Sequence, residues 1–260
     1  MDTLRNKVII VTGATSGIGL ATARLLSRQA ARVVVVGHNQ AALDAVATGL
    51  PGALAICADM TQPDDVRAMI QTAQVELGRI DVLINNAGKA YEGAVADVDI
   101  EWYAYLYRLN VLGPLTAMRE VVPLMRQTGG GHIVNVCSPV AKLTLPGLGL
   151  YASTKASLRA LTLTARSELA RDGIRVSLFY PFITRTDFGQ NAFHSGRTVI
   201  QPFGDNMPDP DAPEFTAGKL IEAIGFGGKE VSARPAWYFL YGMARKRIQR
   251  RGSSAREGAL

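Results

Sequence analysis

Short apolar runs rich in β-branched residues recur along the chain, with longer stretches of helical periodicity between them. Each run is apolar at nearly every position, which is typical of strands buried on both faces of a parallel sheet. Seven runs are expected to form strands: Val8–Val11, Arg32–Val36, Ala53–Cys57, Ile80–Ile84, His132–Cys137, Ile174–Phe179 and, more weakly, Lys229–Ala233. Intervening stretches are expected to form helices: Ile18–Gln29, Pro63–Leu77, Ile100–Met125 and Tyr151–Arg171.

This alternation of strand and helix predicts an α/β fold, a doubly wound parallel sheet with right-handed crossovers. No linker or repeat divides the chain, so we expect a single domain over residues 1–260. Residues 188–213 are rich in Gly, Pro, Asn and Asp with scattered Phe, and they are too many for an ordinary connector. We interpret this stretch as a substrate lid.

The composition, 48% hydrophobic and 19% charged over 260 residues, is that of a globular chain. No apolar run approaches the length of a membrane span, and the polar start leads into an apolar run of only four residues, Val8–Val11. We therefore expect a cytoplasmic protein. Cys57 and Cys137 are too few for a disulfide framework and have no metal-ligand spacing, so buried reduced thiols and no metal site are expected.

The formal charge of +6 comes from one end of the chain. Residues 1–233 hold 21 basic and 21 acidic groups, whereas residues 234–260 hold seven basic groups and one acid. A neutral body argues against a nucleic-acid-binding face. The end combines aromatic Trp237–Tyr241 with basic Arg245–Arg251. Peripheral contact with a membrane, a helix over the cleft or a partner subunit, and a packed segment with a solvated end all stay open.

A glycine-rich turn follows the first expected strand and leads into a helix, in the sequence Thr12-Gly-Ala-Thr-Ser-Gly-Ile-Gly19. Glycines in this position allow a tight turn and let backbone N–H groups approach a pyrophosphate at the helix N-terminus. A turn without a ligand is the alternative, but the strand and helix on either side favour nucleotide binding. The expected contacts are Gly13, Thr15, Ser16, Gly17, Ile18 and Gly19.

The second strand ends in Gly37-His38-Asn39, where a carboxylate would bind the ribose 2′-hydroxyl of NAD. Because no acid is present there, a 2′-phosphate fits, and NADP(H) is favoured over NAD(H), with His38 and Asn39 as contacts. A solvent-facing loop histidine is the alternative for His38. Asp59, followed by Met60, is placed to accept from the adenine amino group or, equally, to cap the next turn. Asn86, Ala87 and Gly88 close the fourth strand and are expected to pack against the nucleotide.

Four polar residues are expected near the carboxyl ends of the strands: Asn110, Ser138, Tyr151 and Lys155. The spacing of four places Tyr151 and Lys155 on one helical face, where a lysine ammonium would lower the pKa of the tyrosine. Ser138 could hold a substrate oxygen, and Asn110 could anchor a water that relays protons. Taken singly, a Tyr-x-x-x-Lys spacing on a helix is usually surface chemistry without a function, so only the combination of the four residues indicates a function.

In their order and spacing, these motifs resemble those of the short-chain dehydrogenase/reductase family over about residues 4–190. The resemblance implies one Rossmann-type domain with seven parallel strands. It implies that Tyr151 is the general acid–base, that Lys155 binds the nicotinamide ribose and lowers the tyrosine pKa, and that Ser138 orients the substrate oxygen. Asn110 would complete the proton relay. The reaction would be hydride transfer between nicotinamide and a carbonyl carbon or its alcohol.

The sequence departs from the family pattern after the sixth strand, where Phe182 follows Pro181 in place of the usual glycine. Thr184 and Thr186 still offer donors for the carboxamide and phosphates. The common tetramer-forming ending is absent, and Pro213-Glu214 instead opens a helix as in a subgroup that acts on bulky hydrophobic substrates. A homodimer is therefore expected, with a tetramer as the alternative. Aromatic residues hint at an apolar cleft, although core packing explains most of them equally: Phe182, Phe188, Phe193, Phe203, Tyr91, Trp102 and Tyr103.

The favoured function is an NADP(H)-dependent carbonyl reductase or alcohol dehydrogenase acting on a small molecule. Two alternatives remain: a catalytically silent nucleotide-sensing or scaffold protein on the same fold, and an epimerase or dehydratase that uses the same cofactor without net oxidation.

Overall fold

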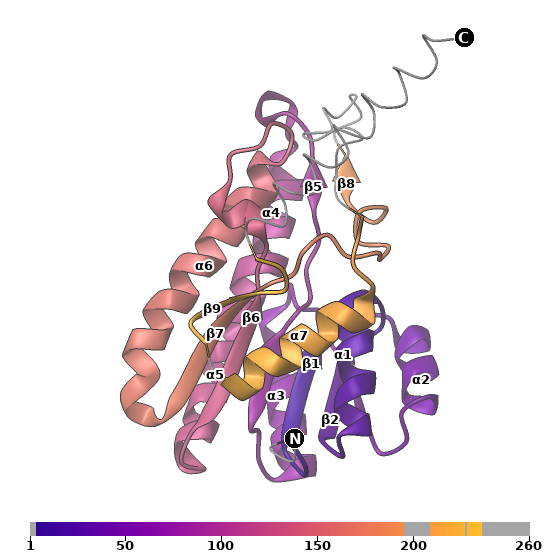
Figure 1. The fold of residues 1–260 in the computed structure, drawn as a ribbon, viewed down its shortest axis with the longest axis vertical. Coiled ribbons are helices and arrows are strands. Elements are labelled where there is room, and N and C mark those ends of the chain that lie inside the picture. Colours follow the sequence, from indigo (N-terminus) through magenta and orange to yellow (C-terminus); the bar gives the residue numbers. More distant parts are fainter. Residues whose placement is uncertain (1–3, 195–208, 227, 236–260) are drawn as a thin grey trace, which may run out of the picture.

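The computed structural model describes residues 4–194, 209–226 and 228–235, and a seven-stranded parallel sheet runs through its centre (Figure 1). The strand order is β3-β2-β1-β4-β6-β7-β9. The strands are β1 (Val8–Thr12), β2 (Arg32–Gly37), β3 (Leu54–Cys57), β4 (Val82–Asn85), β6 (Gly131–Val136), β7 (Ile174–Tyr180) and β9 (Glu230–Ser232). All seven expected strands are confirmed, with ends shifted by at most two residues.

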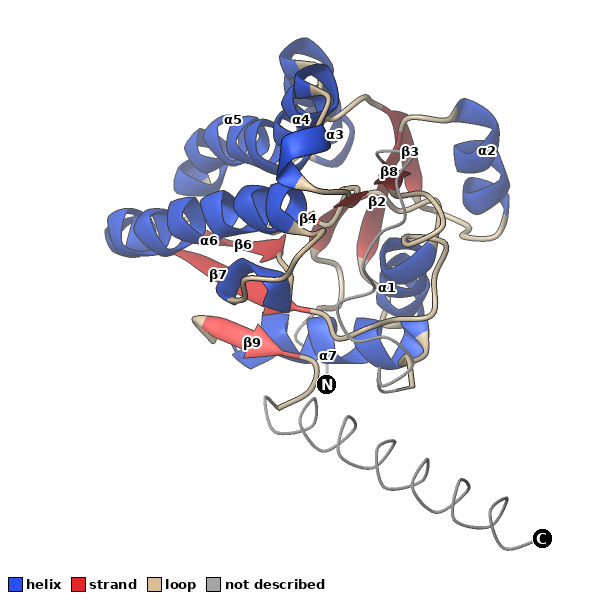
Figure 2. Ribbon diagram, turned by 90° about the horizontal axis from the view of Figure 1, so that it is seen from above, coloured by secondary structure: helices blue, strands red, loops and turns tan. Residues whose placement is uncertain are grey.

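Helices cover both faces of this sheet (Figure 2). The helices are α1 (Gly17–Arg28), α2 (Gln40–Thr48), α3 (Pro63–Leu77), α4 (Ile100–Tyr107), α5 (Gly113–Gln127), α6 (Gly149–Leu169) and α7 (Pro213–Phe226). Helices α1, α2 and α7 pack on one face, and α3, α5 and α6 on the other. The predicted helix at Pro213-Glu214 is therefore present as α7, whereas α2 was not predicted.

The two faces explain why the strands read as continuous apolar runs. Val8 and Ile10 of β1 belong to the core beneath α3 and α5, and Ile9 and Val11 belong to the core beneath α1 and α7. All four side chains are fully buried. A strand in this position has no solvent face, so alternation of apolar and polar residues disappears.

The sheet reverses its direction of winding between β1 and β4. From β1 the chain adds β2 and β3 on one side, then returns to place β4 on the other side of β1. Ligands of open α/β sheets bind in the crevice beyond the carboxyl ends of the strands at such a switch point. The fold therefore directs attention to the loops after β1 and β4.

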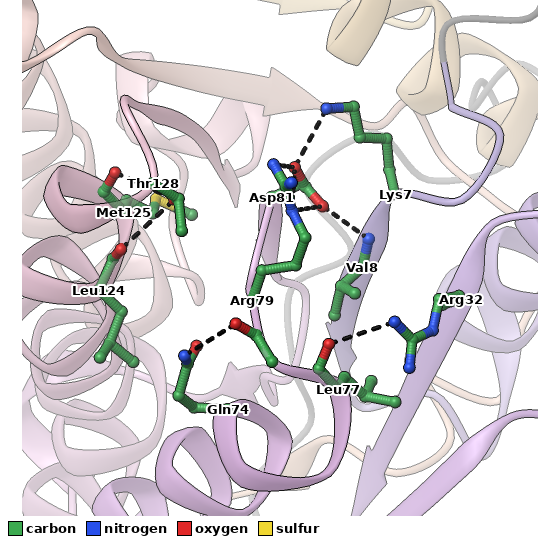
Figure 3. A network of polar contacts seen from close by, with 11 residues as sticks. Lys7, Val8, Arg32, Gln74, Leu77, Arg79, Asp81, Leu124, Met125 and Thr128 are labelled. Atoms are coloured by element: carbon green, nitrogen blue, oxygen red, sulfur yellow. Dashed lines mark hydrogen bonds and ion pairs between the residues drawn. The ribbon is translucent and has the colours of Figure 1, made fainter.

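A polar network holds the opposite, amino edge of the sheet together (Figure 3). The Asp81 carboxylate, 8% exposed, accepts the backbone N–H of Val8 at 2.9 Å and the Lys7 ammonium at 3.1 Å. Arg79 binds the same carboxylate with two nitrogens, Nη2 to Oδ1 at 2.6 Å and Nε to Oδ2 at 3.0 Å. Burial alone would raise the pKa of Asp81, but these three donors together hold it below its ordinary value.

The expected helix over Ile100–Met125 is wrong as one α-helix, because a π-helical turn at Arg108–Leu112 separates α4 from α5. The N–H of Gly113 bonds the carbonyl of Arg108, five residues earlier. Pro114 has no N–H to donate to the carbonyl of Asn110, which favours a break in the ladder at this point. The dipeptide Gly113-Pro114 is therefore the sequence feature that indicates the break between the two helices.

Two expectations for the later part of the chain lie partly outside the described residues. Of the lid, Phe193–His194 forms a two-residue strand, β8, parallel to β5 (Tyr91–Glu92), while residues 195–208 are outside the description. Of the basic end, Arg234 and Pro235 are described and residues 236–260 are not. The interpretations of Trp237–Tyr241 and Arg245–Arg251 are therefore untested.

The expectation for the thiols is half wrong. Cys137 is buried at the end of β6, but Cys57 is exposed. Cys57 ends β3, an edge strand of the sheet, so it lacks the neighbour that covers the central strands.

Within the described ranges, no helix is long and apolar enough to cross a bilayer. The same part of the chain contains no cluster of three or more His, Cys, Asp or Glu side chains suited to a metal.

Candidate active site

A cavity of about 1350 Å³ lies at the carboxyl edge of the sheet. Most of the predicted site residues line it: Gly13, Thr15, Ser16, Gly17, Ile18, His38, Asp59, Met60, Asn86, Ala87, Gly88, Ser138, Tyr151, Lys155, Pro181, Thr184 and Thr186. Gly19, Asn39 and Asn110 do not line it. The glycine-rich turn and the Ser-Tyr-Lys set therefore face one common space.

The turn after β1 packs closely against the loop after β4 because its glycines lack side chains. Gly13 has a φ of 65°, and a Cβ there would lie 2.9 Å from the Cα of Ala87. A Cβ on Gly19 would lie 2.6 Å from Nδ2 of Asn86. Larger residues would push the loop of Asn86 and Ala87 away from the turn. This cradle, which opens onto the N-terminus of α1, fits the pyrophosphate of a dinucleotide.

Thr12 holds the glycine turn and the loop after β4 together through hydrogen bonds. The sequence predicted no role for this residue. Its Oγ1 accepts the backbone N–H groups of Asn86 at 3.0 Å and Ala87 at 3.1 Å. The side-chain amide of Asn86 returns a bond to the carbonyl of Thr12 at 2.9 Å. These hydrogen bonds join the end of β1 to the loop after β4, where Asn86 and Ala87 line the cavity.

After β2, His38 and Asn39, which the sequence predicted to contact the nucleotide together, have different surroundings. His38 is exposed and lines the cavity, whereas Asn39 caps α2, where its Oδ1 accepts the N–H of Ala42 at 3.0 Å. Asp59 lines the cavity and also accepts the N–H of Thr61 at 2.8 Å. Asp59 therefore has the turn-capping role considered as an alternative, with one oxygen left for another donor.

The catalytic candidates come from β6 and α6. Ser138 follows β6, and Tyr151 and Lys155 lie one turn apart in the first half of α6. The Lys155 ammonium donates to the carbonyl of Val136 at 3.0 Å and lies 5.9 Å from the centre of the Tyr151 ring. Tyr151 is 8% exposed and Lys155 4% exposed. A cation and a phenol are thus held beside one another, away from bulk water.

The expected effect of Lys155 on the Tyr151 pKa is not what the structure shows. Burial raises the pKa of Tyr151 above its ordinary value, and a hydrogen bond with Ser138 opposes that rise. Burial also lowers the pKa of Lys155, and the neighbouring Cys137 opposes that fall. Both groups are pushed toward their neutral forms because the low-polarity surroundings penalise either charge. The phenol therefore keeps its proton.

Asn110 anchors a loop instead of facing the cavity. Its side-chain amide donates to the carbonyl of Lys89 at 2.9 Å and to Oγ1 of Thr154 at 3.1 Å, and its Oδ1 accepts the N–H of Lys89 at 3.1 Å. Both N–H groups of the Asn110 side chain are therefore engaged within the protein. Thr154, buried within α6, was missed by the sequence analysis.

The cavity also has apolar lining residues. It is lined by Val140, Leu143, Leu145, Leu148, Phe182 and Phe188. Phe188 is 40% exposed, and its ring centre lies 6.0 Å from that of Tyr151. Of the other aromatic candidates, Trp102 stacks on Phe193 at 4.1 Å and neither lines the cavity, while Phe203 lies outside the described residues. The leucines carried no sequence signal, because their loop has no periodicity.

Comparisons with known proteins agree with this geometry. A model of the short chain dehydrogenase family matches residues 7–196. An uncharacterised oxidoreductase of Methylorubrum extorquens is 36% identical over 247 residues, which are 86% of this chain and 99% of the relative.

Solved structures of the same family have the same fold. A short-chain dehydrogenase from Streptomyces avermitilis is similar with a TM-score of 0.83 at 29% identity, covering 96% of this chain and 97% of that one. A 7α-hydroxysteroid dehydrogenase in complex with NADH and 7-oxo glycochenodeoxycholic acid is similar with a TM-score of 0.81 at 26% identity, covering 89% and 94%. The chain belongs to the short-chain dehydrogenase/reductase family and is an NAD(P)-dependent oxidoreductase.

Proposed function

We propose that the protein reduces the carbonyl group of an apolar, bulky small molecule with NADPH, or oxidises the corresponding alcohol with NADP⁺. The observation that carries this proposal is the shared cavity, which Ser138, Tyr151 and Lys155 line together with the glycine turn and with apolar side chains. A pure nucleotide sensor would have no use for a buried phenol and ammonium beside a space for a second molecule.

Each group of cavity residues would have its own role in the reaction. The turn with Gly13, Ser16 and Gly17, which lines the cavity, would hold the dinucleotide pyrophosphate, and the Lys155 ammonium would donate to the nicotinamide ribose. The bound nicotinamide supplies or accepts the hydride. Ser138 orients the substrate oxygen by a hydrogen bond. Tyr151 donates its proton to that oxygen during reduction and takes it back during oxidation.

The electrostatics of Tyr151 favour the reductive direction. The hydroxyl is protonated at neutral pH even at the ordinary pKa of a tyrosine, and burial, which raises that pKa, keeps the proton in place. A carbonyl that gains a hydride at carbon becomes an alkoxide, a far stronger base than a phenolate. Proton transfer from Tyr151 to that oxygen is therefore downhill, and the product is a neutral alcohol.

The preference for NADP(H) is supported by the rim of the cavity at Gly37 and His38. No carboxylate follows β2 there to repel a 2′-phosphate, and the exposed His38 imidazole and the hydroxyls of Thr15 and Ser16 border the same space. The steroid dehydrogenase relative is described with NADH. The preference proposed for this chain therefore rests on its own rim residues.

A panel assay tests the proposal. NADPH and NADH oxidation would be followed at 340 nm with linear, cyclic and aromatic ketones, comparing wild type with Tyr151→Phe. Turnover of bulky apolar ketones by wild type, faster with NADPH, supports the proposal. Equal background rates for both proteins on every ketone would favour the sensor or scaffold alternative. Conversion of a substrate without loss of NADPH would favour an epimerase or dehydratase.

We also propose a cytoplasmic homodimer. Exposed apolar side chains gather on and after α4, with Ile100 66%, Trp102 43% and Leu112 43% exposed. Large apolar side chains that stay exposed are typical of a surface that meets a partner. Light scattering with size exclusion would give a dimer mass, and Trp102→Glu with Leu112→Glu would convert it to a monomer. An unchanged mass in that double variant would place the contact elsewhere.

A further inference from the structure

The loop after β7 is braced by a residue far along the chain. The backbone N–H of Asp211 donates to the carbonyl of Ile183 at 2.7 Å, and the N–H of Arg185 donates to the carbonyl of Asp211 at 2.9 Å. These two bonds form a parallel bridge between Thr184 and Asp211. Asp211 therefore fixes the backbone on both sides of Thr184, a cavity-lining residue.

A second, stronger contact holds Asp211 itself. Its side chain, 5% exposed, receives Arg234 in a two-pronged ion pair, Nη2 to Oδ1 at 2.6 Å and Nε to Oδ2 at 3.2 Å. The guanidinium lies 4.0 Å over the ring of Phe215 in α7. We call Asp211 and Arg234 the clamp. A buried carboxylate without its arginine would be strongly unfavourable, so the pairing fixes where Asp211 sits.

The braced loop touches the nucleotide cradle. A Cβ placed on Gly17 would lie 3.1 Å from the methyl group of Thr186, so the two loops are in close contact. Thr184 is further fixed by hydrogen bonds of its hydroxyl with the carbonyl of Phe182 at 2.9 Å and with the hydroxyl of Thr216 at 3.0 Å. A shift of Asp211 would therefore be passed to Thr184 and Thr186, at the edge of the space for the dinucleotide.

We propose that Asp211 and Arg234 are positioning residues for nicotinamide dinucleotide binding: the clamp holds residues 183–186 against the bound nucleotide. This inference rests on the dinucleotide-binding role of the cavity, although not on a preference for NADP(H). Asp211 does not line the cavity, whereas Arg234 does. Because Arg234 also borders the space, direct contact between its guanidinium and the nucleotide is the competing explanation that the test must separate.

The test compares dissociation constants for NADPH and NADH, read from nucleotide fluorescence, in Asp211→Asn, Arg234→Gln and the double variant. If the clamp acts as a unit, each single change raises the constant roughly tenfold, and the double variant is no worse than either single variant. Arg234→Lys keeps the charge but loses the two-pronged geometry, so it should weaken binding nearly as much as Arg234→Gln. In steady-state assays, KM for the nucleotide should rise more than kcat falls.

The matched control is Arg79→Gln, which breaks an equally two-pronged arginine–aspartate pair at the amino edge. It should lower the melting temperature without changing nucleotide binding. A weaker affinity in Arg234→Gln with an unchanged one in Asp211→Asn would overturn the clamp in favour of direct contact. Unchanged affinity in both would overturn it outright while leaving the proposed function intact. A wild-type chain that binds neither nucleotide would overturn both proposals.

Discussion

Each edge of the sheet has a two-pronged arginine–aspartate ion pair, and the two pairs have different roles. At the amino edge, Arg79 and Asp81 are two residues apart, and their pair ties the starts of β1 and β4 together through Val8. At the carboxyl edge, Arg234 reaches back to Asp211 across α7, and their pair braces a loop that lines the cavity. Similar two-pronged ion pairs thus serve stability at one edge and, by our proposal, ligand binding at the other.

The two edges also differ in whether their polar groups face the protein or the cavity. Around Asp81, the Lys7 ammonium, the Arg79 guanidinium and the N–H of Val8 all donate to one carboxylate, and none of these residues lines the cavity. Around Tyr151 the hydroxyl and the neighbouring Ser138 border open space. Position relative to the carboxyl ends of the strands, more than residue type, separates a structural network from an active site.

The largest expected effect belongs to Tyr151. Tyr151→Phe keeps the ring and its packing but removes the transferable proton, so kcat should fall by about 10³-fold, within the usual range for general acid–base catalysis. Nucleotide affinity and melting temperature should stay at wild-type values. A rate within threefold of wild type would show that another group moves the proton.

Ser138→Ala should have the next largest effect. Loss of the hydroxyl that orients the substrate oxygen should lower kcat about 10²-fold, as for other single donors to a developing oxyanion. Ser138 Oγ also accepts the N–H of Val140 at 3.4 Å, so a small loss of stability is expected. Ser138→Thr is the control: it retains a hydroxyl and should recover part of the rate. Equal rates for the two variants would contradict the role.

Asp81→Asn tests the amino edge, where stability should change and catalysis should not. Loss of the charged hydrogen bonds should lower the free energy of unfolding by roughly 1–3 kcal/mol at pH 7, with kcat unchanged. Arg126→Gln breaks the more exposed pair with Asp172 and should cost less than about 1 kcal/mol. A fall in kcat of Asp81→Asn, measured on folded protein, would erase the distinction between the edges.

The same carboxylate sets a pH dependence. The folded-state pKa of Asp81 is lowered, so its contribution is fully present above the unfolded-state pKa of about 4 and is lost as the pH falls through the folded value. Denaturant titrations of wild type and Asp81→Asn should therefore converge below pH 4. A stability difference that grew on acidification would contradict the assigned direction.

The smallest expected effect concerns the cavity rim. His38→Asp places a carboxylate beside the site of the 2′-phosphate, so the dissociation constant for NADPH should rise about tenfold while that for NADH stays level or falls. His38→Asn removes the imidazole without adding charge and separates the two causes. Equal changes for both nucleotides in His38→Asp would remove the argument for NADP(H).

The sequence predicted the parts of the molecule that follow from local pattern. Strands such as β1 are buried on both faces, so they read as continuous apolar runs. The glycine turn and the Tyr151–Lys155 spacing are local as well, and both lie where expected. The pattern also placed Cys57 in a strand, but it does not show which strand is at the edge, and so the expected burial of Cys57 was wrong.

What the sequence missed depends on contacts between distant segments. The β5–β8 pair joins residues about a hundred positions apart through two residues in each strand. The role of Asn110 as a loop anchor depends on the backbone of Lys89, and the clamp joins Asp211 to Arg234. The direction of the Tyr151 pKa was also missed, because burial raises it against the hydrogen bond from Ser138, and burial is a property of the folded chain.

The most direct test of the proposed chemistry follows the hydride itself. A ketone that wild type reduces would be incubated with NADPH carrying deuterium at the transferring position of C4, and the alcohol analysed by mass spectrometry. The account predicts one deuterium on the carbinol carbon with wild type and almost no labelled alcohol with Tyr151→Phe. Alcohol without deuterium, or equal labelling by both proteins, would contradict it.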